Sequence, residues 1–285
     1  MAFAGRPIGA PEIGYESLAV RFRLIVSDLD GTLLTPEHRV GDRTQRVLRR
    51  LRDQGIELVL ASGRHFHDVR AISAVFGSGV RTVSSNGAAV YDADGEILEV
   101  ASLEPSCLDF LVSDPAFATV HTNLYRTHDW LVERPEPRLL AYHAESGFSY
   151  RQVDFRSLDH EPVLKVFFYG EHPELSDLQG YIAQRCGGRV ATTFSLPSIL
   201  EVMAEGVSKG AALARIREGL GLDASEVIAF GDGLNDLEML RAAGSGILMG
   251  NADPRLKAAL PGNLVIGGND EEAVARYLEE LYGDG

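Results

Sequence analysis

The chain contains little cysteine: of its 285 residues, only Cys107 and Cys186 are cysteines. Two cysteines cannot build a disulfide framework, and these two lack the spacing of a metal site. We therefore interpret both as buried apolar residues in a reducing compartment. Long apolar runs are also missing, since none reaches the roughly 20 residues of a membrane-spanning helix, and the N-terminus lacks the apolar stretch of a signal peptide. These absences predict a cytoplasmic protein.

Positive charge is scarce as well. There are 27 Lys and Arg residues against 41 Asp and Glu, so the net charge is −14, and no basic run offsets it. Because nucleic-acid binding needs clustered positive charge, we expect no nucleic-acid partner and no membrane partner. A small anionic substrate is still compatible with this charge, since a bound divalent cation can invert the local field.

The length of the chain predicts one large domain that carries a smaller one. Gly and Pro recur in residues 1–20, which we interpret as an irregular leader. Strand and helix patterns alternate through 21–102 and return in 205–285, which predicts one parallel α/β sheet built from both segments. Between 103 and 204, aromatic and β-branched runs with two helical stretches, near 137–146 and 173–185, predict an inserted α+β unit.

Polar residues and glycines follow the predicted strands of the outer segments. Asp28 and Asp30 come after the first strand, Ser62 after the second, and Asp232 and Asp236 after a strand of the last third. Because ligands of open parallel sheets bind beyond the carboxyl ends of the strands, we expect these side chains to meet. Four carboxylates at one site would repel each other without a cation, and an all-oxygen cluster is typical of Mg²⁺.

The chemistry of phosphoryl transfer gives these residues separate roles. A carboxylate can attack phosphorus and form an aspartyl-phosphate, and Asp28 is the candidate nucleophile. Asp30 is the candidate acid/base, which protonates the leaving group and later deprotonates water. The Ser62 hydroxyl, the Gly63 N–H and Lys209 are candidate donors to the phosphoryl oxygens. Alone, each motif is also compatible with a turn or a helix cap, so the prediction depends on their joint occurrence.

Four segments resemble, in order, the motifs of haloacid dehalogenase-like (HAD) phosphatases: DLDGTLL (28–34), ASGR (61–64), SKG (208–210) and GDGLNDLEML (231–240). NGA (86–88) and LMGNA (248–252) are similar to the Cof-type branch, class IIB. The resemblance covers 21–283 and implies a Rossmann-like parallel-sheet core domain, 21–102 and 205–285, with an inserted α+β cap domain at 103–204. One departure is that the usual Asp-Gly-Val near the C-terminus is replaced by Asp270-Glu-Glu-Ala.

The resemblance also implies roles for individual residues. Mg²⁺ would be bound by Asp28, by the backbone carbonyl of Asp30 and by Asp232. Asp236 is assigned from its chemistry alone, as a ligand of the metal either directly or through a partner. Phosphate would be bound by backbone atoms of Leu29 and by Ser62, Gly63, Lys209 and Asn235. We therefore predict a Mg²⁺-dependent phosphatase that hydrolyses small phosphorylated metabolites, with sugar phosphates the expected class, through an aspartyl-phosphate.

Two other functions stay open at this point. One is a phosphomutase of the same superfamily, whose cap has to hold a bisphosphate, and the other is a non-catalytic regulatory or binding module that has kept the fold. His65 and His67 beside the second motif could reach a substrate, but we favour a surface or helix-packing role for both. A cluster in the insert is either a substrate-reading loop or an edge strand with a turn: His121, Tyr125, Arg126, His128 and Trp130.

Overall fold

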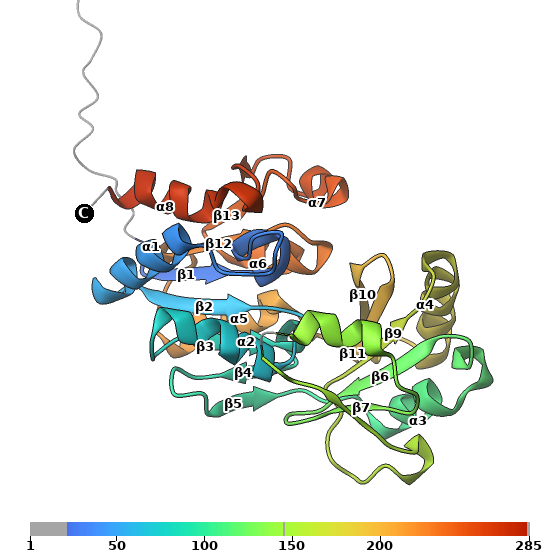
Figure 1. Ribbon diagram of the computed structural model, residues 1–285. Coiled ribbons are helices and arrows are strands. Elements are labelled where there is room, and N and C mark those ends of the chain that lie inside the picture. The colour runs from blue at the N-terminus through green and yellow to red at the C-terminus, as the bar shows by residue number, and fades with distance from the viewer. Residues whose placement is uncertain (1–21, 145, 284–285) are drawn as a thin grey trace, which may run out of the picture.

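The computed structural model describes residues 22–144 and 146–283, and the leader predicted for 1–20 lies outside them. Figure 1 shows two sheets next to each other, one built from the first and last thirds of the chain and the other from the middle third. In the described part of the chain, no helix is long and apolar enough to cross a membrane. The compartment stays a prediction.

The first sheet has eight strands in the order β14-β13-β12-β1-β2-β3-β4-β5. Its strands are β1 (Leu24–Ser27), β2 (Glu57–Ala61), β3 (Arg81–Ser84), β4 (Ala89–Tyr91), β5 (Ile97–Val100), β12 (Val227–Gly231), β13 (Ser245–Leu248) and β14 (Leu264–Val265). From β14 to β3 all neighbours are parallel, and β4 and β5 add an antiparallel edge. Strands far apart in the sequence, β1 and β12, lie side by side at the centre, as the alternating pattern predicts.

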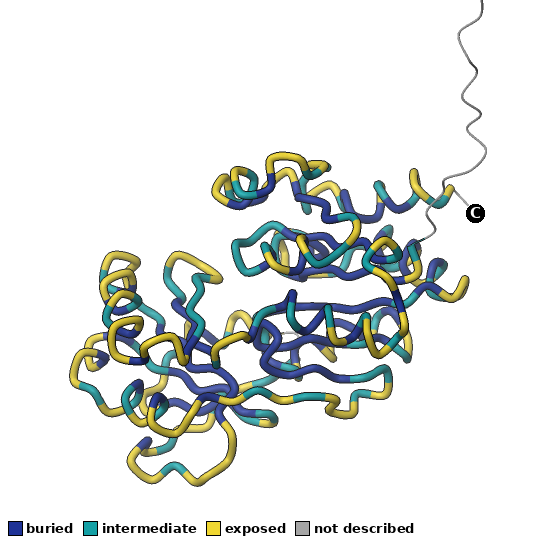
Figure 2. The backbone as a smooth tube through the Cα atoms, turned by 180° about the vertical axis from the view of Figure 1, so that it is seen from behind, coloured by how far each residue is buried: buried dark blue, intermediate teal, exposed yellow. Residues whose placement is uncertain are grey.

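Helices connect these strands and supply the rest of the core. They are α1 (Asp42–Asp53), α2 (Phe66–Ser73), α5 (Lys209–Gly219), α6 (Leu237–Ala242), α7 (Pro254–Ala259) and α8 (Ala273–Tyr282). In α1 the buried residues Val47, Leu48 and Leu51 share one face, because positions three and four apart coincide on a helix. Figure 2 shows the inner strands of this sheet as buried over most of their length, which is why they read as continuous apolar runs, whereas the edge strands β5 and β14 are largely exposed.

The second sheet has six strands in the order β10-β11-β9-β6-β7-β8. Its strands are β6 (His121–Tyr125), β7 (Trp130–Val132), β8 (Tyr150–Gln152), β9 (Lys165–Tyr169), β10 (Val190–Leu196) and β11 (Ile199–Ala204). All neighbours are antiparallel except β7 and β8. Helices α3 (Pro105–Ser113) and α4 (His172–Cys186) pack against it, and both cysteines lie buried in this core.

Two details of the insert differ from the sequence prediction. The stretch near 137–146 forms a 3₁₀-helix, Pro137–His143, in which only Leu139 and His143 are buried. The predicted helical stretch is therefore present as a 3₁₀-helix that ends at His143, and not as an α-helix. Helix α3 was not predicted, because its nine residues bury only Cys107 and Leu111 and give a weak periodic signal.

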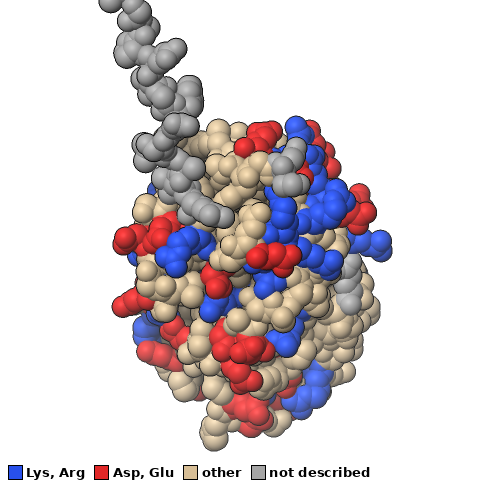
Figure 3. All heavy atoms as spheres, turned by 90° about the vertical axis from the view of Figure 1, so that its left-hand side faces the viewer, with Lys and Arg blue, Asp and Glu red and all other residues tan. Residues whose placement is uncertain are grey.

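The end of the first sheet that lies away from the second sheet carries both signs of charge. Figure 3 views this end, where Lys and Arg side chains are mixed with Asp and Glu side chains. The opposite end is where the carboxyl ends of the parallel strands lie. Ser27 of β1 is in register with Leu60 of β2 and with Phe230 of β12, so the residues that follow these three strands emerge next to each other.

Candidate active site

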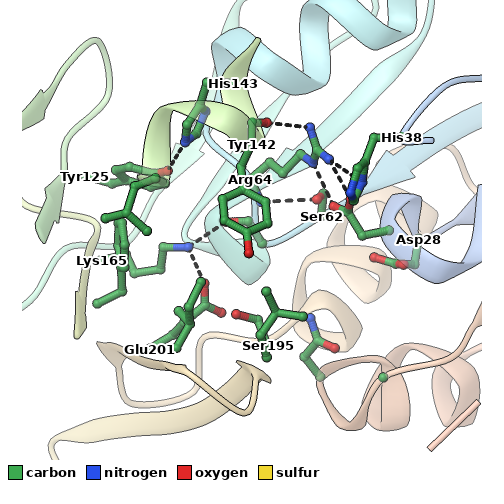
Figure 4. A pocket seen from close by; sticks show the side chains of 18 of the residues that line it. Asp28, His38, Ser62, Arg64, Tyr125, Tyr142, His143, Lys165, Ser195 and Glu201 are labelled. Carbon is green, nitrogen blue, oxygen red and sulfur yellow. Dashed lines mark hydrogen bonds and ion pairs between the residues drawn. The ribbon is translucent and has the colours of Figure 1, made fainter. Parts of the chain in front are cut away.

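The predicted site residues converge where the first sheet meets the second. Asp28 follows β1, Ser62 follows β2, Asp232 follows β12, and Lys209 opens α5. A cavity at this position, seen in Figure 4, is lined by predicted residues of the first sheet: Asp28, Asp30, Ser62, Gly63, Asp232 and Asn235. The other predicted residues, Leu29, Lys209 and Asp236, do not line the cavity and are buried behind it.

A buried lysine holds two of the predicted carboxylates. Lys209 Nζ donates to Asp28 Oδ1 at 2.5 Å and to Asp236 Oδ1 at 2.7 Å, and the lysine is fully buried. Asp28, Asp232 and Asp236 each offer an oxygen, and these three oxygens lie within 4.8 Å of one another. Asp236 Oδ2 also accepts from the backbone N–H of Asp232 and of Gly233, which fixes the loop after β12.

At this cluster three carboxylates lie beside the single ammonium of Lys209. Burial raises the pKa of Asp28 well above its ordinary value despite the opposing effect of Lys209. Burial and then Asp236 raise the pKa of Asp232 to about 7. Burial alone would lower the pKa of Lys209, but Asp236 and Asp28 outweigh it and raise that pKa, so the ammonium stays charged. The raised pKa values of Asp28 and Asp232, with Asp236 beside them, fit a hard divalent cation such as Mg²⁺, which would favour the charged forms of these carboxylates.

The turn after β1 gives the first motif its shape. Gly31 has a φ of +81°, and a Cβ there would lie 2.3 Å from Asp232 Oδ2, so only glycine fits without strain. Thr32 Oγ1 then donates to Asp232 Oδ1 at 2.7 Å. The turn thereby connects the loop of the first motif to the loop of the fourth.

Asp30 points away from the carboxylate cluster. Its oxygens accept from Arg64 Nε at 2.7 Å and from Arg64 Nη2 at 2.5 Å, and His38 Nδ1 lies 3.2 Å from Oδ1. Burial would raise the pKa of Asp30, but the hydrogen bonds from Arg64 and His38 lower it well below its ordinary value. The side chain is therefore held as a carboxylate, outside the group of three that could bind a cation, while its backbone stays a predicted ligand.

Three of the predicted phosphate-binding residues, Ser62, Gly63 and Asn235, lie on two adjoining loops. Ser62 is buried, and its Oγ accepts from the backbone N–H of Arg64 at 3.1 Å. Asn235 Nδ2 donates to Asn86 Oδ1 at 3.0 Å, and the backbone N–H of Asn86 donates to the Ser62 carbonyl at 3.0 Å. Asn86, which follows β3, therefore joins the loop of the second motif to the loop of the fourth.

The second sheet supplies the far wall of the cavity (Figure 4). Most of that wall is apolar or aromatic: Tyr125, Leu139, Tyr142, Phe167, Leu196 and Ile199. Its polar members are His143, Lys165, Ser195 and Glu201. A bound substrate would place its phosphate among the carboxylates and its leaving group against this wall.

Sequence reasoning missed Lys165 and Glu201. Both are buried and both line the cavity. A signal was present, because each is a single charge inside an apolar strand, VLKVFF and ILEVM. Such a charge is rarely buried unless it is paired.

Some of the predicted histidines and insert residues pack in a core, and others line the cavity. His65 is buried and stacks on Phe148, with ring centroids 4.2 Å apart, so its predicted packing role holds, although it contacts the insert. Of the insert cluster, Tyr125 lines the cavity, whereas Trp130 is buried in a core. Arg126 is buried beside Asp159 and Glu161.

Comparison with known proteins identifies the family. The family model of haloacid dehalogenase-like hydrolases matches residues 25–278, and the chain belongs to this family. It is 43% identical to a Haemophilus influenzae protein provisionally named a phosphatase, over 92% of this chain and 97% of that protein. It is 37% identical to the HMP-PP phosphatase of Enterobacter sp. (strain 638), over 90% of this chain and 94% of that protein.

The fold is shared with a solved structure of the same superfamily. That structure, described as a HAD subclass IIB sugar phosphatase, superimposes with a TM-score of 0.79 over 91% of this chain and 99% of the other, at 21% identity. The predicted family, its phosphatase class and its parallel-sheet fold with a second α+β unit are thereby confirmed.

Proposed function

We propose that this chain is a Mg²⁺-dependent phosphatase that hydrolyses small phosphorylated metabolites through an aspartyl-phosphate on Asp28. The observation that carries the proposal is the contact of Asp28 with Lys209 at 2.5 Å beside two further carboxylates, at the edge of the cavity. A nucleophilic carboxylate needs neighbours that favour its ionised form and that hold phosphoryl oxygens. Lys209 lowers the pKa of Asp28 against the effect of burial, and a bound Mg²⁺ would lower it further. The second need is met by Ser62, Gly63 and Asn235.

The reaction has two steps, and Asp28 and Asp30 divide the work. In the first, an Asp28 oxygen attacks phosphorus, the bond to the leaving oxygen breaks, and Asp30 gives that oxygen a proton. In the second, Asp30 takes a proton from the water that hydrolyses the acyl phosphate. The contacts with Arg64 and His38 hold Asp30 in the base form of the second step. We expect Asp30 to become protonated, as the first step requires, once a bound substrate loosens its contacts with Arg64 and His38.

Asp28, Asp232 and Asp236 are the side chains that would hold Mg²⁺, together with the backbone of Asp30. When bound, the cation would neutralise the carboxylates and withdraw charge from the phosphoryl group. Lys209 and the cation together would favour the ionised form of Asp28, and the hydrogen bond from Thr32 would hold Asp232 in place.

Substrates of a phosphatase differ in their leaving group, and we propose two substrate classes for this chain. Sugar phosphates are the class expected from the resemblance. HMP-PP is the second candidate, because a relative with 37% identity is named for it. Aromatic and aliphatic residues dominate the far wall of the cavity. An apolar wall with few polar groups favours a leaving group with a sizeable apolar face.

The other two functions have less support. A phosphomutase needs a clamp for a second phosphate, and Lys165 is the one Lys or Arg that the described second sheet contributes to the cavity. It is already paired with Glu201. A non-catalytic module would have no need of the complete set Asp28, Asp30, Lys209 and Asp232.

The division into domains is part of the proposal. We propose a core domain of residues 21–102 and 205–285 and a cap domain of residues 103–204. The cavity lies between the sheets of these two segments, so the core would carry the chemistry and the cap would select the leaving group.

The test is turnover of a generic aryl phosphate with and without Mg²⁺, followed by a panel of sugar phosphates and HMP-PP. We expect hydrolysis with Mg²⁺, none in excess chelator, and recovery when Mg²⁺ is restored. Full activity in chelator would contradict the metal dependence, and no activity on any phosphate ester would contradict the function.

A further inference from the structure

A buried ion pair of the second sheet faces the active-site loops. Lys165 of β9 and Glu201 of β11 are 2% and 3% exposed, and Lys165 Nζ lies 2.5 Å from Glu201 Oε1. Burying two charges is costly, and a buried pair is often no more stable than apolar residues of the same size. The pair therefore needs an explanation other than the stability of its own sheet.

Figure 4 shows Lys165 and Glu201 side by side at the cavity, and each of them also contacts a loop that follows a strand of the first sheet. Lys165 Nζ donates to the backbone carbonyl of Gly63 at 2.5 Å. Glu201 Oε2 accepts from Asn86 Nδ2. The ammonium thus holds the loop of the second motif, and the carboxylate holds the loop after β3.

Asn86 passes the second contact on to the fourth motif. Its Oδ1 accepts from Asn235 Nδ2 at 3.0 Å, so both ends of its amide are used. Asn86 is 1% exposed and has a φ of +57°, a backbone conformation that Asn tolerates better than most residues. A chain of polar contacts therefore runs from Lys165 through Glu201 and Asn86 to Asn235.

We propose that Lys165 and Glu201 are positioning residues that fix the phosphate-binding loops from the second sheet. Lys165 sets the place of the Gly63 loop, and Glu201 sets the place of Asn235 through Asn86. The phosphate site is then complete only while the two sheets are docked. This inference depends on the proposed function, because it assigns a task to the same site.

The test replaces the pair by apolar residues and measures phosphate-analogue binding. The double variant Lys165→Met with Glu201→Leu removes both charges together, so it should fold with a stability similar to that of the unchanged protein. We expect its affinity for orthovanadate, measured by calorimetry with Mg²⁺ present, to fall about 10- to 100-fold, because a charged hydrogen-bond partner is lost on each loop. A role limited to packing would leave that affinity unchanged.

Two further variants test the route through Asn86. Asn86→Gly keeps the left-handed backbone accessible and removes only the amide, and should weaken orthovanadate binding to a similar degree. If Glu201 acts through Asn86, combining Asn86→Gly with Glu201→Leu should cost about as much as the larger single loss. Glu201→Gln, which keeps an acceptor for Asn86, should bind orthovanadate more tightly than Glu201→Leu. If the double variant instead lost affinity by the product of the two single losses, Glu201 would not act through Asn86.

The matched control is Ser146→Ala. Ser146 Oγ donates to Asp68 Oδ1, so this change removes another contact between the two sheet regions without touching a motif loop. We expect unchanged orthovanadate affinity, and a loss equal to that of the double variant would overturn the proposal. An unchanged protein with no phosphatase activity would instead contradict the proposed function, so the two failures can be told apart.

Discussion

Asp28 and Asp30 lie two residues apart but in different surroundings. One oxygen of Asp28 is bound to Lys209, whereas both oxygens of Asp30 are bound to Arg64. Asp28→Asn leaves the Lys209–Asp236 pair intact, so the protein should fold, but the nucleophile is gone. We expect turnover to fall by several orders of magnitude with no phosphoenzyme. Asp30→Asn keeps the nucleophile but loses the proton donor and the base.

The mass of the intact protein separates these two outcomes. After mixing with an activated phosphate ester and Mg²⁺, the Asp30→Asn protein should retain a phosphoryl adduct, because a good leaving group needs no proton whereas hydrolysis does. The Asp28→Asn protein should show none. An adduct on the Asp28→Asn protein would show that Asp28 is not the nucleophile.

His65 makes the stability of the protein depend on pH. Burial, the largest effect, lowers its pKa from 6.5 to about 3, despite the hydrogen bond to the Arg126 carbonyl. As the pH falls below 6.5, the unfolded chain takes up the proton first, so the stability contributed by neutral His65 is lost between pH 6.5 and about 3. We expect a decline approaching about 1.4 kcal/mol per pH unit in the free energy of unfolding. His65→Gln should have a shallower decline in urea titrations from pH 6.5 to 5, and equal slopes would refute this.

The sequence predicted the residues of the core motifs because each follows its own strand or opens its own helix. Asp28, Ser62 and Asp232 needed only the rule that parallel strands end at one edge. Lys165 and Glu201 could not be assigned in this way, because their partners are loops of the other sheet. How two sheets dock depends on side chains far apart in the sequence, and no local pattern specifies it.

At the scale of elements, the start of α1 depends on a residue near the C-terminus. Glu272 Oε2 accepts from the backbone N–H of Thr44 at 2.7 Å and from Thr44 Oγ1 at 2.9 Å. Glu272 itself has a φ of +50°, in the left-handed region. This is the segment where the sequence departs from the usual Asp-Gly-Val of the family. Here Glu272 has a strained backbone conformation, and its side chain caps the start of α1.

Two substitutions separate the cap from the strain. Glu272→Ala keeps the strained backbone and loses both hydrogen bonds, so we expect the free energy of unfolding to fall by about 1 to 2 kcal/mol. Glu272→Gly loses the same bonds but relieves the strain, and should be about 1 kcal/mol more stable than the alanine protein. Urea unfolding measures both values. Equal stabilities of the two variants would contradict the strain, and an alanine protein as stable as the unchanged one would contradict the cap.

Helices that bury several residues on one face were predicted within a few residues, and helices that bury few residues were not. α1 buries four residues on one face and was predicted closely. α3 and the 3₁₀-helix at 137–143 each bury only two, so packing against the second sheet determines their form more than their own sequence does.

For the whole molecule, the central feature is a cavity closed by two sheets that the chain connects twice, after β5 and after β11. Several polar contacts bridge the sheets besides the Lys165–Glu201 chain. Arg64 Nη1 donates to the Tyr142 carbonyl at 3.1 Å, and His143 Nδ1 lies 2.7 Å from Asp68 Oδ2. Water can replace such contacts at modest cost, so the two sheets can separate without breaking either core.

We therefore predict that the cap is a mobile lid with hinges near Leu103 and Ala204. Closing it over the carboxyl ends of the strands would exclude water while Asp28 attacks phosphorus. Solution scattering should show a smaller radius of gyration with Mg²⁺ and orthovanadate together than with Mg²⁺ alone, because the ligand binds the loops that the second sheet contacts. The Lys165→Met, Glu201→Leu protein should compact less at the same ligand concentration, since its sheets lack the connecting pair. An unchanged radius in the unmodified protein, with orthovanadate shown by calorimetry to be bound, would mean that the cap is a fixed wall of the cavity.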